Sequence, residues 1–441
     1  MSKISLKDIN RIAIPAIVAG IAEPLISLTD IAIIGNVDRN SVEALAAVGL
    51  VGSFLSAIIW ILAQTKTAIS ALVSQHLGAN RLNAVKTLVP QTIALNFVLS
   101  ILIYSVTALL SEFIFRELFE AKGLILEYST AYYRIRALGF PLTLVTFAIF
   151  GVFRGLQNTS WAMTCSLTGG AVNVLFTYLL VYGIDGIFEG LHLTGAAIGS
   201  LLAQLTMLIM ALIYFFNKTP FNLKVSLKPN PQLRPLLLMS LNLFLRTLFL
   251  NIAIITSNRL ATTYGNNHIA AQSILMNIWL FFSFFIDGFA NAGNAIGGRL
   301  FGEKNFKALW YLSIDISKYA ILIALLLVGL CSIFYKSIGI IFNEDLEVLN
   351  IFYSLFWIVL AMQPINALAF VFDGIFKGLG KAVFLRNVLF AATFLGFLPT
   401  VFICDAFELE LYGIWIAFFV WMLIRSLSLI LKFRLDYLNK D

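Results

Sequence analysis

Residues 15–35 read PAIVAGIAEPLISLTDIAIIG, an apolar run long enough to cross a bilayer that nevertheless contains two acids, Glu23 and Asp30. A membrane helix needs about 20 predominantly apolar residues, and a carboxylate at membrane depth is costly unless it faces a partner or a water-filled cavity. Pro15 and Pro24 each remove a backbone hydrogen bond within this run, which predicts a bend. The stretch therefore predicts a membrane helix that bends and carries titratable groups.

The whole chain has the composition of a polytopic membrane protein. Of its 441 residues, 60% are hydrophobic and 12% charged, and the mean hydropathy is +0.91, whereas soluble domains are about 45 to 50% apolar. The connections between apolar runs are short and leave no room for a soluble domain. We expect an all-α membrane protein with twelve transmembrane helices, at residues 11–34, 44–73, 85–110, 124–150, 160–182, 194–216, 236–260, 268–297, 308–335, 346–374, 382–404 and 411–431.

Basic residues gather on one side of the predicted membrane. The N-terminal tail, alternate loops and the C-terminal tail hold most of the 30 Lys and Arg residues, and the opposite loops hold most of the 23 acids. Because basic loops stay in the cytoplasm, we expect both termini to be cytoplasmic in a bacterial inner membrane, without a cleaved signal peptide. The net charge of +7 then reflects topology and not nucleic-acid binding. The three cysteines predict neither a disulfide framework nor a metal site.

The second half of the chain repeats the first. GVFRGL at residues 151–156 matches GIFKGL at residues 374–379, and each hexapeptide begins ten residues after a proline, Pro141 or Pro364. Each half spans the membrane six times, which predicts parallel repeats related by an axis along the membrane normal, a transporter arrangement. The predicted division is an N-lobe at 1–216, a cytoplasmic linker at 217–235 and a C-lobe at 236–441.

Polar residues inside a helix of only one half are the candidates for a transport site, because features shared by both halves more often serve folding. In the first half these are Asp30 and Glu23, the pair Asn173 and Thr177 four residues apart, and Lys66. Asn173 and Thr177 fit a transport role and simple bonding between helices equally well. Lys66 fits neutralisation of a carboxylate and extension towards the cytoplasmic interface equally well.

The second half carries a different polar set, the residues Arg246, Asp287, Gln363, Asn366 and Asp373. Arg246 lies too deep in its helix to reach the interface, so we expect a buried ion network between it and Asp287 or Asp373. This network either fixes the helix bundle or contains an acid that changes its protonation partner during transport. Three further basic residues inside helices look less informative: Arg134, Arg136 and Arg425.

The chain resembles the multidrug and toxic compound extrusion (MATE) family, most closely its DinF-like branch. The resemblance extends through both halves, from about residue 10 to about residue 430, and is carried by PLISLTDIAIIGN (24–36), EALAAVGL (43–50), QHLGAN (75–80), PLTLVTFAIFGVFRGLQNT (141–159), AAQSILMNIWLFFSFFIDGFANA (270–292) and QPINALAFVFDGIFKGLGKA (363–382). It implies a two-lobed antiporter of twelve helices that exports organic, usually cationic or amphiphilic compounds in exchange for protons or sodium ions.

The resemblance also implies roles for individual residues. Asp30 matches the helix 1 acid thought to couple ion and substrate, Pro15 the proline where that helix bends, and Asn173 a polar position near the acid. Thr177 stands where many relatives have a second acid, and Glu23 is an extra acid that would take over part of that role. Asp287 and Asp373 match acids that are typical of the second lobe in the DinF-like branch.

Other functions fit the sequence less well. A flippase of a lipid-linked saccharide is the nearest alternative, but such flippases usually line their cavity with several cations, whereas the first half carries two acids beside few basic residues.

The chain has no His-Glu-x-x-His, Gly-x-Ser-x-Gly or phosphate-binding loop, so neither an enzyme nor ATP-driven transport is expected. We expect a monomer in the lipid bilayer with a small organic substrate and no cofactor besides the coupling ion.

Overall fold

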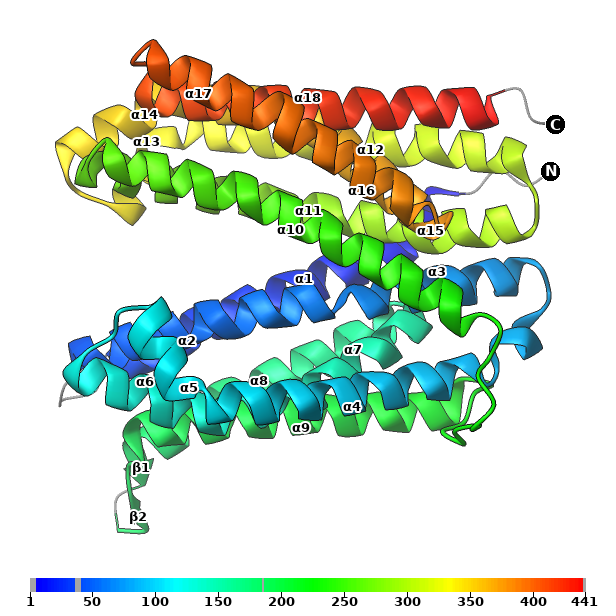
Figure 1. Cartoon of the computed structure of the whole chain (residues 1–441), viewed down its shortest axis with the longest axis horizontal. Helices are drawn as coiled ribbons and strands as arrows, with labels where there is room; N and C mark the ends of the chain where they lie inside the picture. Colours follow the sequence, from blue (N-terminus) through cyan, green and yellow to red (C-terminus); the bar gives the residue numbers. More distant parts are fainter. Residues whose placement is uncertain (1–4, 36–40, 185, 439–441) are drawn as a thin grey trace. The chain divides into compact units, whose positions relative to one another are not determined.

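The computed structural model describes residues 5–35, 41–184 and 186–438, apart from the side chains of residues 22–28, 31 and 41. Nearly all of this part is helical (Figure 1). Its strands form one short antiparallel hairpin, β1 (Gly183–Ile184) and β2 (Phe188–Glu189). The prediction of an all-α membrane protein is confirmed.

The helices follow the predicted apolar runs. The first half contains α1 (Leu6–Gly35), α2 (Ser41–Leu62), α3 (Gln64–Gly78), a 3-10 turn (Leu82–Val85), α4 (Leu88–Leu109), α5 (Ser111–Phe113), a π turn (Ile114–Leu118), α6 (Gly123–Arg136), α7 (Gly139–Gly155), α8 (Ser160–Tyr182) and α9 (His192–Lys218). The second half contains α10 (Leu233–Thr263), α11 (Asn266–Gly302), α12 (Phe306–Ile333), α13 (Tyr335–Phe342), α14 (Leu346–Ala361), α15 (Gln363–Gly378), α16 (Ala382–Ala391), a π turn (Ala392–Phe397), α17 (Leu398–Ala406) and α18 (Glu410–Tyr437).

These segments account for the predicted spans. Within the described residues, nine helical segments are long and apolar enough to cross a membrane, and two bent helix pairs bring the number to eleven. The remaining predicted span, 11–34, coincides with α1, which is helical throughout. The twelve-helix, two-repeat prediction therefore agrees with the structure.

The two bent pairs occupy equivalent positions in the two halves. α6 and α7 meet at 46°, and α14 and α15 meet at 48°. Pro141 is the third residue of α7 and Pro364 the second residue of α15. Since proline cannot donate the backbone hydrogen bond to the preceding turn, each bend follows from its proline. The repeat detected in the sequence is thus a repeat of helix geometry.

The repeated glycines bring the bent helices close to their neighbours. A Cβ atom at Gly151 on α7 would lie 2.4 Å from the carbonyl oxygen of Lys66 on α3. One at Gly374 on α15 would lie 2.2 Å from the carbonyl oxygen of Ala290 on α11. Small residues allow such backbone contact between membrane helices. The hexapeptide match therefore corresponds to the same helix contact made once in each half.

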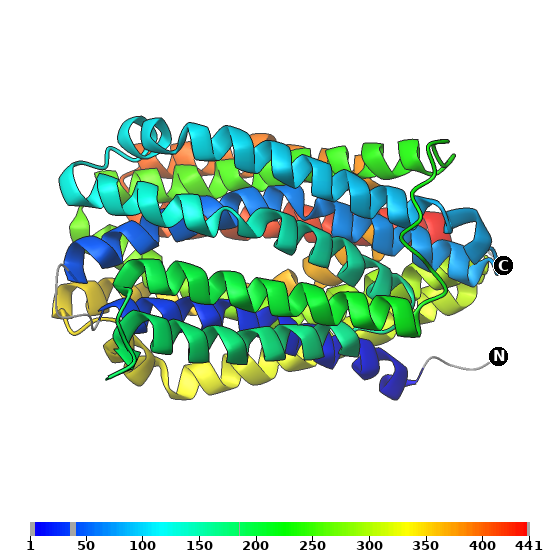
Figure 2. The ribbon, with the colours of Figure 1, turned by 90° about the horizontal axis from the view of Figure 1, so that it is seen from below.

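The chain forms two compact units, which we describe separately. One unit comprises residues 18–73 and 81–237, and the other residues 1–17, 74–80 and 238–441. In the first unit α8 and α9 pack side by side along their length (Figure 2). In the second unit α11 packs against α15, and α18 contributes the fully buried rings of Trp415 and Trp421 to the core.

Candidate substrate and ion-coupling site

Asp30 on α1 is a buried acid with 5% of its surface exposed. Ser200 Oγ, on α9, donates a hydrogen bond of 3.2 Å to Asp30 Oδ2. The other carboxylate oxygen, Oδ1, is buried and accepts no hydrogen bond from a described residue. The carboxylate therefore keeps one oxygen for a further partner.

Asn173 and Thr177 on α8 lie beside this carboxylate, and for Asn173 the family resemblance implies this position. Asn173 Nδ2 donates to Thr177 Oγ1 at 3.4 Å and to Ser200 Oγ at 3.2 Å. Asn173 Oδ1, like Asp30 Oδ1, is buried without a hydrogen-bond donor in the described part of the chain. The first unit thus gathers an acid, an amide and two hydroxyl groups from α1, α8 and α9.

Ser200 is a member of this cluster that the sequence did not identify. Serine is common in this chain, so nothing marked this hydroxyl except its place after Gly199. A Cβ atom at Gly199 would lie 2.6 Å from Thr177 Oγ1, so α9 approaches α8 at this point because residue 199 has no side chain. That close approach places the Ser200 hydroxyl between Asn173 and Asp30.

Arg136 also belongs to this cluster, although its sequence position made it look less informative. It lies at the end of α6, and its positive charge acts on the Asp30 carboxylate. Its Nε atom is buried and has no hydrogen-bond partner among the residues the structure describes. An opposite charge near a buried carboxylate favours the ionised form, so Arg136 opposes the effect of burial at Asp30.

The remaining first-half predictions have different outcomes. The ammonium group of Lys66, on α3, lies 4.6 Å from the centre of the Phe147 ring, a cation–π contact. The side chains of Glu23 and Pro24 lie outside the described residues. Pro15 is buried in α1, and the predicted bend of that helix stays a prediction.

The second unit contains the ion network that the sequence predicts. Arg246 Nη2, on α10, lies 2.6 Å from Asp373 Oδ1, and Arg246 Nε donates to the same oxygen at 3.0 Å. Lys377 Nζ lies 2.6 Å from Asp373 Oδ2, one helical turn further along α15. Of the two acids considered, Asp373 is therefore the one bonded to Arg246.

Asp287 on α11 has an exposed side chain, and its charge acts on Lys377 and Arg425. The two amides of the predicted set, Gln363 and Asn366, are fully buried next to each other. Gln363 Nε2 donates to the carbonyl of Val359 at 2.8 Å, and Trp279 Nε1 on α11 donates to the side-chain oxygen of Asn366 at 2.8 Å. These two amides therefore hold α15 in place.

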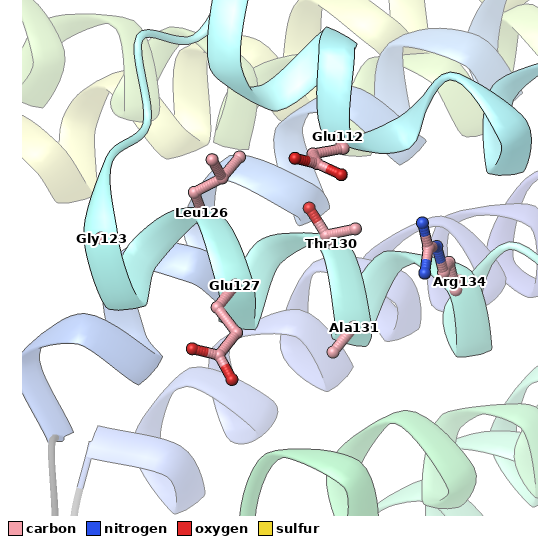
Figure 3. A pocket seen from close by; sticks show the side chains of 7 residues that line it. All are labelled: Glu112, Gly123, Leu126, Glu127, Thr130, Ala131 and Arg134. Carbon is pink, nitrogen blue, oxygen red and sulfur yellow. The ribbon is translucent and has the colours of Figure 1, made fainter.

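A surface hollow of about 370 Å³ lies apart from the predicted residues (Figure 3). Glu112 pairs with Arg116, and Arg134 Nε donates to Ser111 Oγ at 3.3 Å. Two of the charged side chains at this hollow, those of Glu112 and Arg134, therefore have local partners. Its lining residues are Glu112, Gly123, Leu126, Glu127, Thr130, Ala131 and Arg134.

Two repeated halves with different buried charges define a multi-pass membrane protein with the arrangement of a transporter. The MatE family model matches residues 15–179 and 242–402, so the chain belongs to this family, whose members are transporters and not enzymes. The chain is 24% identical to DNA damage-inducible protein F of Escherichia coli over 446 residues, covering 98% of this chain and 93% of that protein. It is accordingly a DinF-like member.

Two further comparisons agree with this assignment. The chain is 28% identical to Protein DETOXIFICATION 45, chloroplastic, of Arabidopsis thaliana over 300 residues, which is 67% of this chain and 51% of that protein. The chain thus spans about half the length of this plant relative. A structure described as the outward-facing conformation of a multidrug resistance MATE family transporter superposes with a TM-score of 0.88, at 21% identity, over 98% of this chain and 95% of the other.

Proposed function

We propose that the protein is an efflux antiporter that exports small organic compounds, cationic or amphiphilic, in exchange for protons, and that Asp30 couples the two movements. The observation that carries the proposal is the half-satisfied carboxylate of Asp30, buried beside Asn173, Thr177 and Ser200. Ionisable residues inside membrane helices characteristically mark ion and substrate pathways.

The chemistry of a carboxyl group supports exchange. An ionised carboxylate attracts a cation, and a proton bound to the same group removes that attraction. A proton entering from the outer side therefore displaces a cationic substrate, and release of the proton to the cytoplasm restores the site. Glu23 shares the helix with Asp30, and we expect the two to titrate as a coupled pair.

Sodium is the second candidate ion, because Asp30 Oδ1 and Asn173 Oδ1 both lack a described hydrogen-bond donor and hard cations bind oxygen ligands. Thr177 offers a hydroxyl where a second acid would strengthen such a site, which favours the proton. The flippase alternative gains no support, since the matched relatives include proteins named for detoxification and multidrug export.

The proposal includes the orientation and assembly of the protein. From the basic tails and linker we infer that both termini lie in the cytoplasm of a bacterial inner membrane. A single chain carries both halves, so a monomer is sufficient for transport, and the driving force is an ion gradient without ATP.

Replacement of Asp30 tests the coupling role. The variant Asp30→Asn, reconstituted into vesicles with an acidic interior, should take up the fluorescent cation ethidium no faster than protein-free vesicles, because asparagine binds no proton. The thermal stability of the variant in detergent should stay close to that of the wild type.

The control is Asp436→Asn, which removes an acid that pairs with Lys432 near the end of α18. This variant should retain uptake at the wild-type rate. Uptake by a stable Asp30→Asn protein at the wild-type rate would show that Asp30 does not couple transport.

A further inference from the structure

The connection between α9 and α10, residues 219–232, is held by the side chains of two buried residues, Gln91 and Asn230. Gln91 Nε2, on α4, donates to the carbonyls of Ser226 and Lys228, each at 2.8 Å. Gln91 Oε1 accepts a hydrogen bond of 2.9 Å from the backbone N–H of Asn230. The connection therefore lies against the start of α4 within the first unit, with its backbone fixed there (Figure 2).

Asn230 joins the same connection to the short helical turn before α4. Its Nδ2 atom donates to the carbonyl of Ala84 at 2.9 Å and to Thr87 Oγ1 at 2.7 Å. Lys86 lies between these two residues in the sequence and is exposed. The bonds of Asn230 thus place a basic part of the chain next to the connection.

The exposed side chains at this end of the first unit are basic and apolar. Leu227 lies at a bend of the connection and is 100% exposed, and Val225 is 53% exposed. Six basic residues here are exposed: Arg81, Lys86, Lys218, Lys224, Lys228 and Arg234. The acids of the first unit lie within α1 or at and beyond the opposite ends of three membrane-length segments, residues 42–78, 82–109 and 192–218. The surface therefore carries positive charge alone.

The neighbouring helices indicate where this surface lies relative to a bilayer. Both α9 and α10 are long and apolar enough to cross a membrane, so the segment that joins them lies at a membrane surface. Basic residues directly beside a membrane helix attract anionic lipids, and lysine side chains extend to the headgroups. An acidic soluble partner would use the same charges but would leave Leu227 in water, because the fixed backbone cannot turn this side chain inwards.

We propose that residues 219–232 form a docking surface for anionic phospholipids, in which the basic side chains bind the phosphate groups and Leu227 enters the apolar part of the interface. Gln91 and Asn230 position this surface. In the proposed orientation the lipids belong to the cytoplasmic leaflet. The surface goes beyond the proposed function, and its test measures lipid binding without transport.

The test uses the full protein in a neutral detergent with equal amounts of phosphatidylglycerol and phosphatidylcholine that have the same acyl chains. Native mass spectrometry measures the ratio of the two lipids that stay bound. The wild type should retain the anionic lipid in at least about fivefold excess, the factor that one basic residue contributes beside an anionic membrane surface.

Two matched variants separate this surface from the total charge of the protein. In the test variant three exposed lysines are changed to glutamine, and the lipid ratio should fall close to one: Lys218, Lys224 and Lys228. In the control the same change is made at three exposed lysines of the second unit, and the wild-type ratio should remain: Lys304, Lys307 and Lys381. Both variants lose the same net charge at exposed positions, so neither should lose stability.

Gln91→Leu tests whether the fixed backbone matters. This change removes three hydrogen bonds of the connection without altering any charge, so the ratio should fall at least about twofold while the melting temperature shows that the protein stays folded. Equal retention of the two lipids by the wild type, or a wild-type ratio in the test variant or in Gln91→Leu, would overturn the proposal.

Soluble polyglutamate distinguishes a lipid surface from a site for an acidic protein. It should leave the lipid ratio of the wild type unchanged. Binding of polyglutamate by the wild type and not by the test variant, with displacement of the anionic lipid, would assign the surface to an acidic protein and overturn the lipid proposal. Asp30→Asn should keep the wild-type ratio, so failure of the coupling proposal leaves this result unaffected.

Discussion

At the scale of single residues, the two units use buried charge in opposite ways. Asp30 has one carboxylate oxygen bonded to Ser200 and one without a described donor. Asp373 has both oxygens bonded, one to Arg246 and one to Lys377. A fully satisfied carboxylate is held in one protonation state and one position. We therefore propose that Asp30 exchanges ions and that Asp373 has a structural role.

The structural role predicts a large loss of stability in Arg246→Ala. Breaking a buried pair leaves an uncompensated charge and costs about 3 to 5 kcal/mol. Chemical unfolding in detergent measures the effect, and Arg116→Ala, which breaks the exposed pair with Glu112, should cost less than about 1 kcal/mol. In a double-mutant cycle the effects of Arg246→Ala and Asp373→Asn should not add. Additive effects would mean that the two residues do not stabilise each other.

The sequence predicts some of these residues and not others for a physical reason. Asp30 and Arg246 stand out because a charge inside an apolar run is rare and costly, so position alone identifies them. Ser200 does not stand out, because a hydroxyl is tolerated in membrane helices and its role depends on which helix lies opposite. The partner of Arg246 stayed open between two acids, since helix spacing fixes the face of a residue but not its neighbour.

At the scale of helices, the repeated prolines and glycines determine how each half packs. Pro141 and Pro364 end the straight part of a span at equivalent points. A reciprocal glycine contact adds to this in the second unit: a Cβ atom at Gly78 would lie 1.9 Å from the carbonyl oxygen of Arg299, and one at Gly302 would lie 1.9 Å from that of Gln75. The backbones of α3 and α11 are in direct contact at these two points, which is possible only because both residues are glycines.

The close contact of α15 with α11 predicts that Gly374→Ala is destabilising. The added methyl group meets the carbonyl oxygen of Ala290 at 2.2 Å, and overpacking of this kind costs about 1 to 3 kcal/mol. Gly329→Ala, at a helical glycine where an added methyl group has nothing within 4 Å, should be neutral or more stable by up to about 1 kcal/mol. Thermal unfolding in detergent compares the two, and equal melting temperatures would contradict the packing account.

Helix positions follow well from the sequence, and helix boundaries less well. Apolar length locates the spans because a bilayer of fixed thickness demands it. The run predicted as one span at 44–73 forms one membrane-length segment, residues 42–78, in which α2 ends at Leu62 and α3 begins at Gln64. No proline marks this break, so the composition of the run could not show it.

At the scale of the whole molecule, the two compact units correspond only in part to the first and second halves of the sequence. The predicted boundary at residues 235–236 lies close to the observed division between Leu237 and Leu238. Residues 1–17 and 74–80 nevertheless belong to the compact unit formed mainly by the second half. Contacts such as that of Gly78 with Arg299 cause this, and they join segments too distant in the sequence for a composition pattern to reveal.

The central claim is that an ion gradient drives export of an organic cation, and transport by the wild-type protein under separately imposed gradients tests it most directly. Vesicles with an acidic interior and no sodium should accumulate ethidium above the level of protein-free vesicles, and vesicles loaded with sodium at equal pH should not. Accumulation under the sodium gradient alone would contradict proton coupling. No accumulation under either gradient would contradict the account of the protein as an ion-coupled exporter.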